Sequence, residues 1–294
     1  MAGIYFHYPF CSQACNYCNF HFSTQTKYRQ QMQQAMKSEL YLRKSELKTP
    51  IESIYFGGGS PSLLPASFFH KVIKSVNDCF KLSNNIEITL EANPNDLTLQ
   101  NLKDLKKSGV NRISIGVQSF HDYELKMMNR IHNSNQGLKA IEWTSKVFDN
   151  FSVDLIYGLP KSNISTWAHN LDILTSFNPP HISSYALTVE PKTVLFRQVD
   201  KGDIKLLDEE AVQLQYDLLT SRLEKEAYIN YEFSNFGKIG FHSVNNSNYW
   251  NGKPYLGIGP SAHSYDGHRV RSWNISNNNL YVGEGGRIRK IKLN

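Results

Sequence analysis

Three of the four cysteines in this 294-residue chain lie close together near its start. Cys11, Cys15 and Cys18 have the spacing C-x3-C-x2-C, and Cys79 stands apart. The sequence contains no apolar run of membrane-spanning length and no signal-peptide pattern, so a cytoplasmic location with reduced thiols is expected. Clustered thiols in that compartment favour metal binding or catalysis over disulfide formation.

These thiols fit an iron–sulfur cluster better than a structural zinc ion. Structural zinc takes four ligands, and a second C-x2-C pair is missing, although His7 or His21 is an available fourth ligand. Three cysteines on a four-iron cubane leave one iron with an open position, which is useful for chemistry. The spacing therefore predicts a [4Fe-4S] cluster on Cys11, Cys15 and Cys18, with zinc as the alternative.

Short apolar runs alternate with segments of helical length over the first 190 residues. The runs lie at residues 4–8, 52–57, 86–91, 112–117, 152–158 and 182–188. Helical spacing marks 27–47 and 98–109 between them. Alternating strands and helices predict an α/β fold with a parallel sheet, and six units suit a partial (β/α)6 TIM-like barrel. A doubly wound open sheet is the alternative, because periodicity does not distinguish the two.

Polar and glycine-rich positions follow the predicted strands one after another. The cysteines follow the first strand and GGGSP (57–61) follows the second. Glu91 ends the third strand, Gln118 follows the fourth, and Asp154 lies in the fifth. The carboxyl ends of parallel strands meet at one face of a barrel, so these positions predict a site on that face.

The cysteine spacing, with Tyr17 just before the last cysteine, resembles the signature of radical S-adenosylmethionine enzymes. The motifs YFHYPFCSQACNYCNF, FGGGSPSLL, LEANP, ISIGVQSF, MNRIH and DLIYGLP resemble, in order, one branch of that family. This branch contains oxygen-independent coproporphyrinogen oxidase and the HemW-type heme chaperones, and the resemblance extends over most of the chain. It implies that the cluster binds S-adenosylmethionine and that one electron cleaves the sulfonium to a 5′-deoxyadenosyl radical.

The resemblance also implies which residues bind S-adenosylmethionine. Gly57, Gly58 and Gly59 would let the backbone approach its ammonium group. Glu91 would bind the ribose hydroxyls, and Arg130 would pair with the carboxylate. The whole implied set is Tyr5, Tyr17, Gly58, Gly59, Ser60, Glu91, Gln118, Arg130 and Asp154. No catalytic residue is assigned.

Position 20 separates the two members of the branch. The oxidase has a fourth cysteine two places after the third, whereas Phe20 matches the chaperone-like pattern. The resemblance therefore implies heme binding and delivery to respiratory hemoproteins, and Phe20 argues against decarboxylation of coproporphyrinogen III. No nucleic-acid partner and no transmembrane segment are expected, and peripheral contact with a membrane stays open.

The heme-linked motif of that group, H-N-x-x-Y-W, is altered in this chain. The segment reads NNSNYW, with Asn245 at the place of the histidine, and a carboxamide is a poor iron ligand. His242 is the predicted substitute, and His263 is a second candidate. The predicted heme residues are His242, Asn246, Tyr249 and Trp250. A degenerate paralogue that binds no tetrapyrrole is a further alternative.

Three segments are expected along the chain. Residues 1–205 would form the core barrel with the cluster and S-adenosylmethionine sites, and 206–280 an extension that lies against it. Residues 281–294 would be a basic tail, in place of the C-terminal domain expected from the resemblance. The net charge of +6 favours anionic partners, although four of the basic residues lie in that tail.

Overall fold

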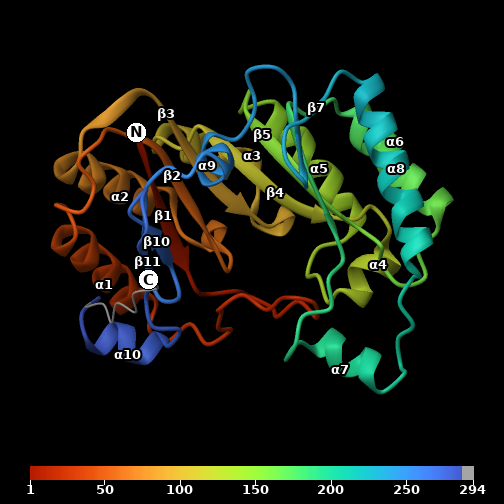
Figure 1. Ribbon diagram of the computed structural model, residues 1–294, viewed down its shortest axis with the longest axis horizontal. Helices are drawn as coiled ribbons and strands as arrows, with labels where there is room; N and C mark the ends of the chain where they lie inside the picture. Colours follow the sequence, from red (N-terminus) through yellow and green to blue (C-terminus); the bar gives the residue numbers. More distant parts are fainter. Residues whose placement is uncertain (287–294) are drawn as a thin grey trace.

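Six parallel strands form the centre of the computed structural model, which describes residues 1–286 (Figure 1). They are β1 (Ala2–Tyr8), β2 (Ile51–Gly58), β3 (Leu82–Ala92), β4 (Arg112–Gln118), β5 (Phe151–Tyr157) and β6 (His181–Ala186). Each strand pairs in parallel with the next along the chain, without the reversal of order that defines a doubly wound sheet. β1 also pairs with β9, and β6 with β8, so the barrel stays open. The predicted partial (β/α)6 barrel is confirmed.

Helices connect these strands and cover the outer face of the sheet (Figure 1). They are α1 (Arg29–Leu42), α2 (Ala66–Cys79), α3 (Leu99–Lys107), α5 (Ser134–Ser145), α6 (Ile164–Ser176) and α8 (Glu209–Lys225). Shorter elements lie in the connections: α4 (Asp122–Met127), α7 (Val194–Asp200), and the 3-10 turns Pro61–Leu63 and Pro94–Asp96. Several helices begin at a side-chain cap, as where Thr98 accepts a hydrogen bond from the Asn101 amide at the start of α3.

The segment after α8 continues the same sheet at both edges. It contains β7 (Ile229–Asn230), β8 (Asn235–Gly237), α9 (Val244–Trp250), β9 (Tyr255–Ile258), β10 (His263–Tyr265), β11 (Arg271–Trp273) and α10 (Asn278–Gly283). β8 runs antiparallel to β6, and β9 runs parallel to β1. The amides of Val244 and Asn245 donate to the Glu87 carboxylate of β3, which fixes the N-terminus of α9 to the barrel.

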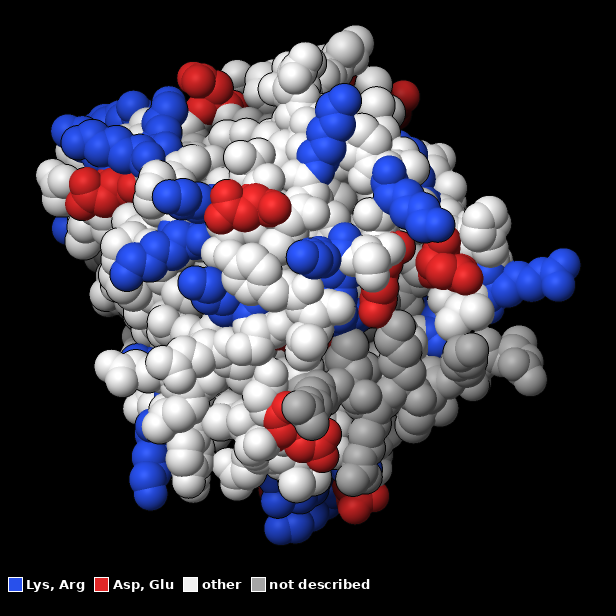
Figure 2. All heavy atoms as spheres, turned by 90° about the vertical axis from the view of Figure 1, so that its left-hand side faces the viewer, with Lys and Arg blue, Asp and Glu red and all other residues white. Residues whose placement is uncertain are grey.

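The face of the molecule that carries α1 and α2 has a mild basic character. Figure 2 shows the side of the molecule that carries α1 and α2, where basic side chains outnumber acidic ones but the two signs are interspersed. Most of the expected basic tail lies outside the described residues, which end at 286. Within residues 1–286, no helix combines the length and the apolar character that a membrane crossing requires.

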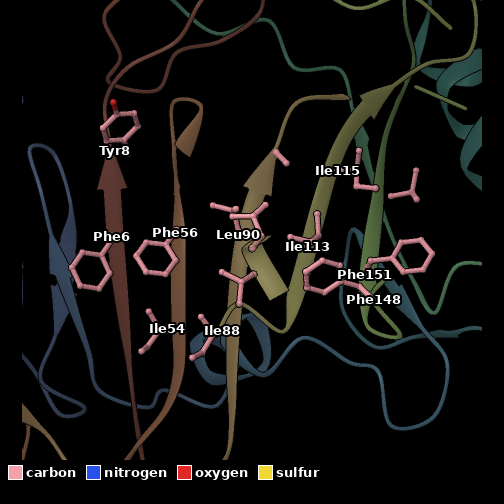
Figure 3. Close-up of a cluster of buried hydrophobic side chains, with 14 of the residues drawn as sticks. Phe6, Tyr8, Ile54, Phe56, Ile88, Leu90, Ile113, Ile115, Phe148 and Phe151 are labelled. Carbon is pink, nitrogen blue, oxygen red and sulfur yellow. The ribbon is translucent and has the colours of Figure 1, made fainter. Parts of the chain in front are cut away.

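The hydrophobic core lies between the strands and the outer helices. Alternate residues of successive strands, such as Phe6, Phe56 and Leu90, point to this side (Figure 3). The Phe6 and Phe56 rings stack 5.1 Å apart, and Phe56 meets Phe69 of α2 edge to face at 5.0 Å. Burial of these rings holds the helical layer on the sheet.

The opposite faces of the same strands are polar. Ser53, Glu87, Arg112, Ser152 and His181 occupy the inner positions of β2 to β6, and all five are buried. A TIM barrel normally fills this space with branched apolar side chains. Here the interior consists of hydrogen-bonding groups, so the barrel can hold a polar ligand.

Candidate functional site

The loop that carries the three cysteines is fixed at both of its sides. The Cys11 amide donates to the Ser23 carbonyl at 3.1 Å, which closes the loop after β1. The Asn16 amide donates to the Met128 carbonyl at 3.0 Å, and Asn129 Nδ2 donates to the Ala14 carbonyl at 2.7 Å. Asn129 has a positive φ of 57°, so a left-handed turn after α4 presents these groups to the loop.

The glycines at 57–59 have no room for side chains. A Cβ on Gly57 would lie 2.9 Å from the Glu91 carboxyl carbon, and one on Gly59 would lie 2.7 Å from the Phe10 carbonyl oxygen. Gly58 has a φ of 106°, a left-handed conformation that glycine adopts without strain. The glycines therefore bring β2 against the cysteine loop and the Glu91 side chain.

Glu91 is a partly buried carboxylate at the mouth of the barrel. It accepts hydrogen bonds from the Tyr55 hydroxyl at 2.9 Å and from the Gly58 amide at 3.2 Å. Burial raises the pKa of Glu91 to about 7, which the Tyr55 hydrogen bond partly offsets. Glu91 can therefore accept hydrogen bonds at neutral pH. Its charge at that pH changes with the groups that lie next to the carboxylate.

Arg130 is a partly buried residue that lines the cavity. It lies after α4, and its guanidinium reaches three acceptors across the barrel mouth. Nη2 donates to Asn93 Oδ1 and to the Gly116 carbonyl, both at 2.7 Å. Nη1 donates to Cys15 Sγ at 3.4 Å. The structure thereby joins a predicted ligand-binding residue directly to a predicted cluster residue.

Asp154 of β5 lines the same cavity as Glu91. It accepts hydrogen bonds from Ser114 Oγ at 3.0 Å and from Ser152 Oγ at 2.9 Å. Burial raises the pKa of Asp154, while these hydroxyls lower it. Gln118 ends β4 with a φ of 69°, so a strained backbone position turns its side chain at the strand end.

A single cavity of about 480 Å³ contains most of the predicted site. All three clustered cysteines line it, as do all the predicted S-adenosylmethionine residues except Tyr5, which is not among the lining residues. The Tyr5 hydroxyl instead bonds to His7 Nδ1 at 3.1 Å. Lining residues that sequence reasoning missed include Tyr55, Asn93, Arg112, Ser114, Ser183 and Tyr185. Each is a single polar residue without a spacing signature, so only its place on a strand, or directly after one for Asn93, could have indicated it.

The predicted heme residues are divided between the cavity and the surface. Asn246 lines the cavity, whereas Tyr249 and Trp250 are exposed on α9. Trp250 is 60% exposed, and its ring lies 5.8 Å from Phe233, which is 77% exposed. Glu232 accepts a hydrogen bond from Trp250 Nε1 at 3.1 Å and holds the indole in place. The two rings form an exposed aromatic pair that the sequence motif alone did not reveal.

Position 245 faces the barrel interior rather than this aromatic pair. Asn245 is 5% exposed, its amide donates to Glu87, and its side chain lies beside Ser53 Oγ at 3.5 Å. His242 stacks on Tyr231 at 4.3 Å, and its Nε2 atom is buried without a hydrogen-bond partner among the described residues. His263, the second candidate, stacks on Trp273 at 5.8 Å.

Comparison with known proteins gives one consistent answer. Residues 5–174 match the sequence profile described as the radical SAM superfamily. Heme chaperone HemW of Bacillus subtilis is 35% identical over 271 residues, which cover 91% of this chain and 72% of that protein. Heme chaperone HemW of Buchnera aphidicola subsp. Schizaphis graminum is 34% identical over 99% of this chain and 77% of its own length.

A solved structure shares the whole fold. Coproporphyrinogen III oxidase (HemN) from Escherichia coli, a radical SAM enzyme, superimposes with a TM-score of 0.84. The match covers all of this chain and 72% of the oxidase, at 23% identity. At that identity the likeness establishes the architecture and not the activity.

Proposed function

The chain belongs to the radical SAM superfamily and, within it, to the HemW family, and from this premise we propose that it is a cytoplasmic heme chaperone. It would bind heme and deliver it to respiratory hemoproteins. The family implies a [4Fe-4S] cluster and S-adenosylmethionine.

The residues present fit the two cofactors. Three thiols line the cavity, and among residues 1–286 no group of His, Cys, Asp and Glu side chains is arranged for a single metal ion. That arrangement suits a cluster, because each cysteine of a cubane binds a different iron and the sulfurs lie farther apart than around one ion. We propose that Cys11, Cys15 and Cys18 hold the cluster.

S-adenosylmethionine would occupy the adjoining part of the cavity. Glu91 would accept hydrogen bonds from the ribose hydroxyls, and the backbone around Gly58 would leave space for the methionine end. Ser60 is held by Asn93 Nδ2 at 2.7 Å, and Gln118 and Asp154 line the inner wall. When bound, the cluster and S-adenosylmethionine supply one-electron cleavage of the sulfonium. The residues of this chain position the ligand and limit its contact with water.

The presence of Phe20 at position 20 is the observation that favours the chaperone function over the oxidase activity. It stands where a fourth cysteine is expected in the oxidase, and it is 67% exposed at the cavity wall.

We place heme against the aromatic pair of Phe233 and Trp250, with Tyr249 beside it. An axial ligand could come from His242, because its Nε2 has no partner, but the ring would have to turn from its stack on Tyr231.

A hemin titration of the anaerobically reconstituted protein, followed at the Soret band, tests this function. A saturable shift at about one heme per chain is expected. Trp250→Ala should weaken binding because a large aromatic contact is lost. His242→Ala should change the Soret position if His242 binds the iron, whereas His70→Ala, at an exposed histidine of α2, should change nothing.

Asn245→His completes the comparison. Because position 245 points into the barrel, restoring the family histidine should not change the heme spectrum. The absence of a saturable shift in protein with an intact cluster would reject the chaperone function. An assay for decarboxylated coproporphyrinogen III would then decide between the oxidase and a paralogue that binds no tetrapyrrole.

A further inference from the structure

The three proposed cluster ligands have different surroundings. Cys11 lies beside the Ser60 hydroxyl, and Cys18 lies beside the backbone amide of Phe20. Cys15 Sγ accepts a hydrogen bond from the Arg130 guanidinium at 3.4 Å. Within residues 1–286, it is the one clustered sulfur that receives a hydrogen bond from a charged side chain.

The guanidinium is held firmly in the orientation that makes this contact. Nη2 is shared between Asn93 Oδ1, just after β3, and the Gly116 carbonyl of β4, each at 2.7 Å, so two acceptors from different segments fix its plane. A Cβ on Gly116 would lie 2.8 Å from Gln118 Nε2 and 3.4 Å from Nη2, so the glycine leaves room for the Gln118 amide beside the guanidinium. Nη1 is thereby directed at Cys15 rather than free to follow a mobile partner.

The environment of the guanidinium makes its charge effective. The Nε atom of Arg130 is buried and has no hydrogen-bond partner among the described residues. Among the described residues no carboxylate forms a salt bridge with Arg130: Glu91 bonds to Tyr55 and Gly58, and Asp96, although it feels the Arg130 charge, bonds to Ser62. A positive charge in a partly desolvated site without a paired carboxylate acts strongly on a neighbouring thiolate.

We propose that Arg130 is a positioning residue that raises the reduction potential of the cluster through Cys15. This inference rests on the proposed cluster and concerns this chain's own residues around it. Reduction adds one electron to the cluster and increases the negative charge on its sulfurs. A fixed positive charge and an N–H···S hydrogen bond both favour the reduced form, so removing them should make reduction harder.

This role is separate from pairing with the carboxylate of S-adenosylmethionine. Nη2 already has two acceptors within the protein, and Nη1 has Cys15, so the contacts of Arg130 do not require the ligand. The potential can therefore be measured without S-adenosylmethionine. A carboxylate contact would change the affinity for S-adenosylmethionine, whereas the inferred contact changes the potential of the ligand-free protein.

The test is a redox titration of reconstituted full-length protein without S-adenosylmethionine, monitored by electron paramagnetic resonance. Arg130→Met should shift the midpoint potential to more negative values by at least about 59 mV. For a one-electron reduction this corresponds to a tenfold change in the equilibrium constant. Arg130→Lys retains the charge and should shift it less. Arg222→Met removes an exposed arginine of α8 and should leave the midpoint unchanged.

Iron content separates the possible failures. A wild-type protein that binds no iron would overturn the proposed cluster and this inference together. An intact cluster with equal midpoints in the wild type and Arg130→Met would overturn the inference alone. Where Arg130→Met does not retain iron, Asn93→Ala decides: loss of one Nη2 acceptor should give a smaller negative shift, and an unchanged midpoint would contradict the proposal.

Discussion

At the scale of single residues, the clustered thiols can be distinguished from the remaining one. Cys11, Cys15 and Cys18 line the cavity, while Cys79 ends α2 on the far side of the sheet from it. Replacing any of the three by Ala should abolish the cluster, because each would bind a different iron. Iron analysis and the broad charge-transfer absorbance measure this loss. Cys79→Ala should retain both, and equal iron in all four variants would disprove the ligand assignment.

Gly59 makes a second prediction at this scale. A methyl group there would lie 2.7 Å from the Phe10 carbonyl oxygen and 2.9 Å from the Phe10 amide nitrogen, so the backbone before Cys11 would have to move. Gly59→Ala should cost about 1–3 kcal/mol of stability and lower the iron content. Thermal unfolding and iron analysis measure the two effects.

Gly283 provides the matched control for this substitution. It has no atom within 4 Å of the position of an added Cβ and lies at the end of α10. Gly283→Ala should leave iron content and stability near those of the wild type. A Gly59→Ala protein that is equally unaffected would show that the cysteine loop adapts at no cost.

At the scale of elements, the long periodic segments were predictable and the short ones were not. All six central strands lie where the apolar runs indicated, and α3 lies within the predicted 98–109. β7 to β11 have two to four residues each, which is too short for an alternating pattern to appear. β3 begins at Leu82 instead of 86 because Leu82 pairs with Ile51 of β2 ahead of a register shift, whereas the polar start LSNN has no strand pattern of its own.

The site was predicted in the same uneven way. Residues with a spacing, such as the cysteines and the glycine run, were identified from the chain alone. Asn93, Asn129 and Arg112 were not, because each is one polar residue whose partners are distant in sequence. The orientation of Asn245 could not be predicted either, since it depends on how α9 is fixed to Glu87.

The attachment of the extension to α1 gives a prediction at this scale. The buried Glu39 carboxylate accepts hydrogen bonds from Arg43 Nη1 at 2.8 Å, Asn274 Nδ2 at 2.7 Å, the Gly259 amide at 2.9 Å and the Tyr281 hydroxyl at 2.5 Å. Glu39→Ala removes the acceptor that these four donors share and the buried carboxylate partner of Arg43, although Arg43 Nη1 keeps the Gly257 carbonyl and Asn274 Nδ2 keeps the Gly259 carbonyl. The substitution should cost about 3–5 kcal/mol. Urea denaturation measures the loss.

An exposed ion pair serves as the comparison for Glu39. Glu142 pairs with Lys146 on the surface of α5, where solvent screens the interaction. Glu142→Ala should leave the urea midpoint unchanged. A Glu39→Ala midpoint that is also unchanged would mean that the extension does not depend on this contact.

At the scale of the whole molecule, buried histidines make stability depend on pH. His132 is buried, its Nε2 bonds to the Val117 carbonyl at 3.0 Å, and its Nδ1 has no partner among the described residues. Burial, with a smaller effect of the nearby Arg130 charge, lowers the pKa of His132 to about 4. In the unfolded chain the same imidazole has a pKa of about 6.5. Between these values the unfolded state binds a proton that the folded state does not.

The free energy of unfolding should therefore fall as the pH is lowered from about 6.5 to about 4. At about 1.36 kcal/mol per pKa unit, His132 accounts for up to about 3 kcal/mol of this loss. His132→Gln removes the titration while its amide can still donate to the Val117 carbonyl. Urea denaturation at a series of pH values should show a shallower loss in this variant than in the wild type.

The comparison isolates one group from opposing ones. Burial raises the pKa of Glu91 to about 7, so protonation of Glu91 favours the folded state as the pH falls and partly offsets the effect of the histidines. Glu91 and the buried His7 are present in both proteins, so their contributions cancel in the difference. His70→Gln, at an exposed position of α2, should follow the wild-type curve. Parallel curves for His132→Gln and the wild type would mean that His132 is protonated alike in the folded and unfolded states. The acid sensitivity would then have to come from His7 or His181, whose pKa values are also lowered by burial.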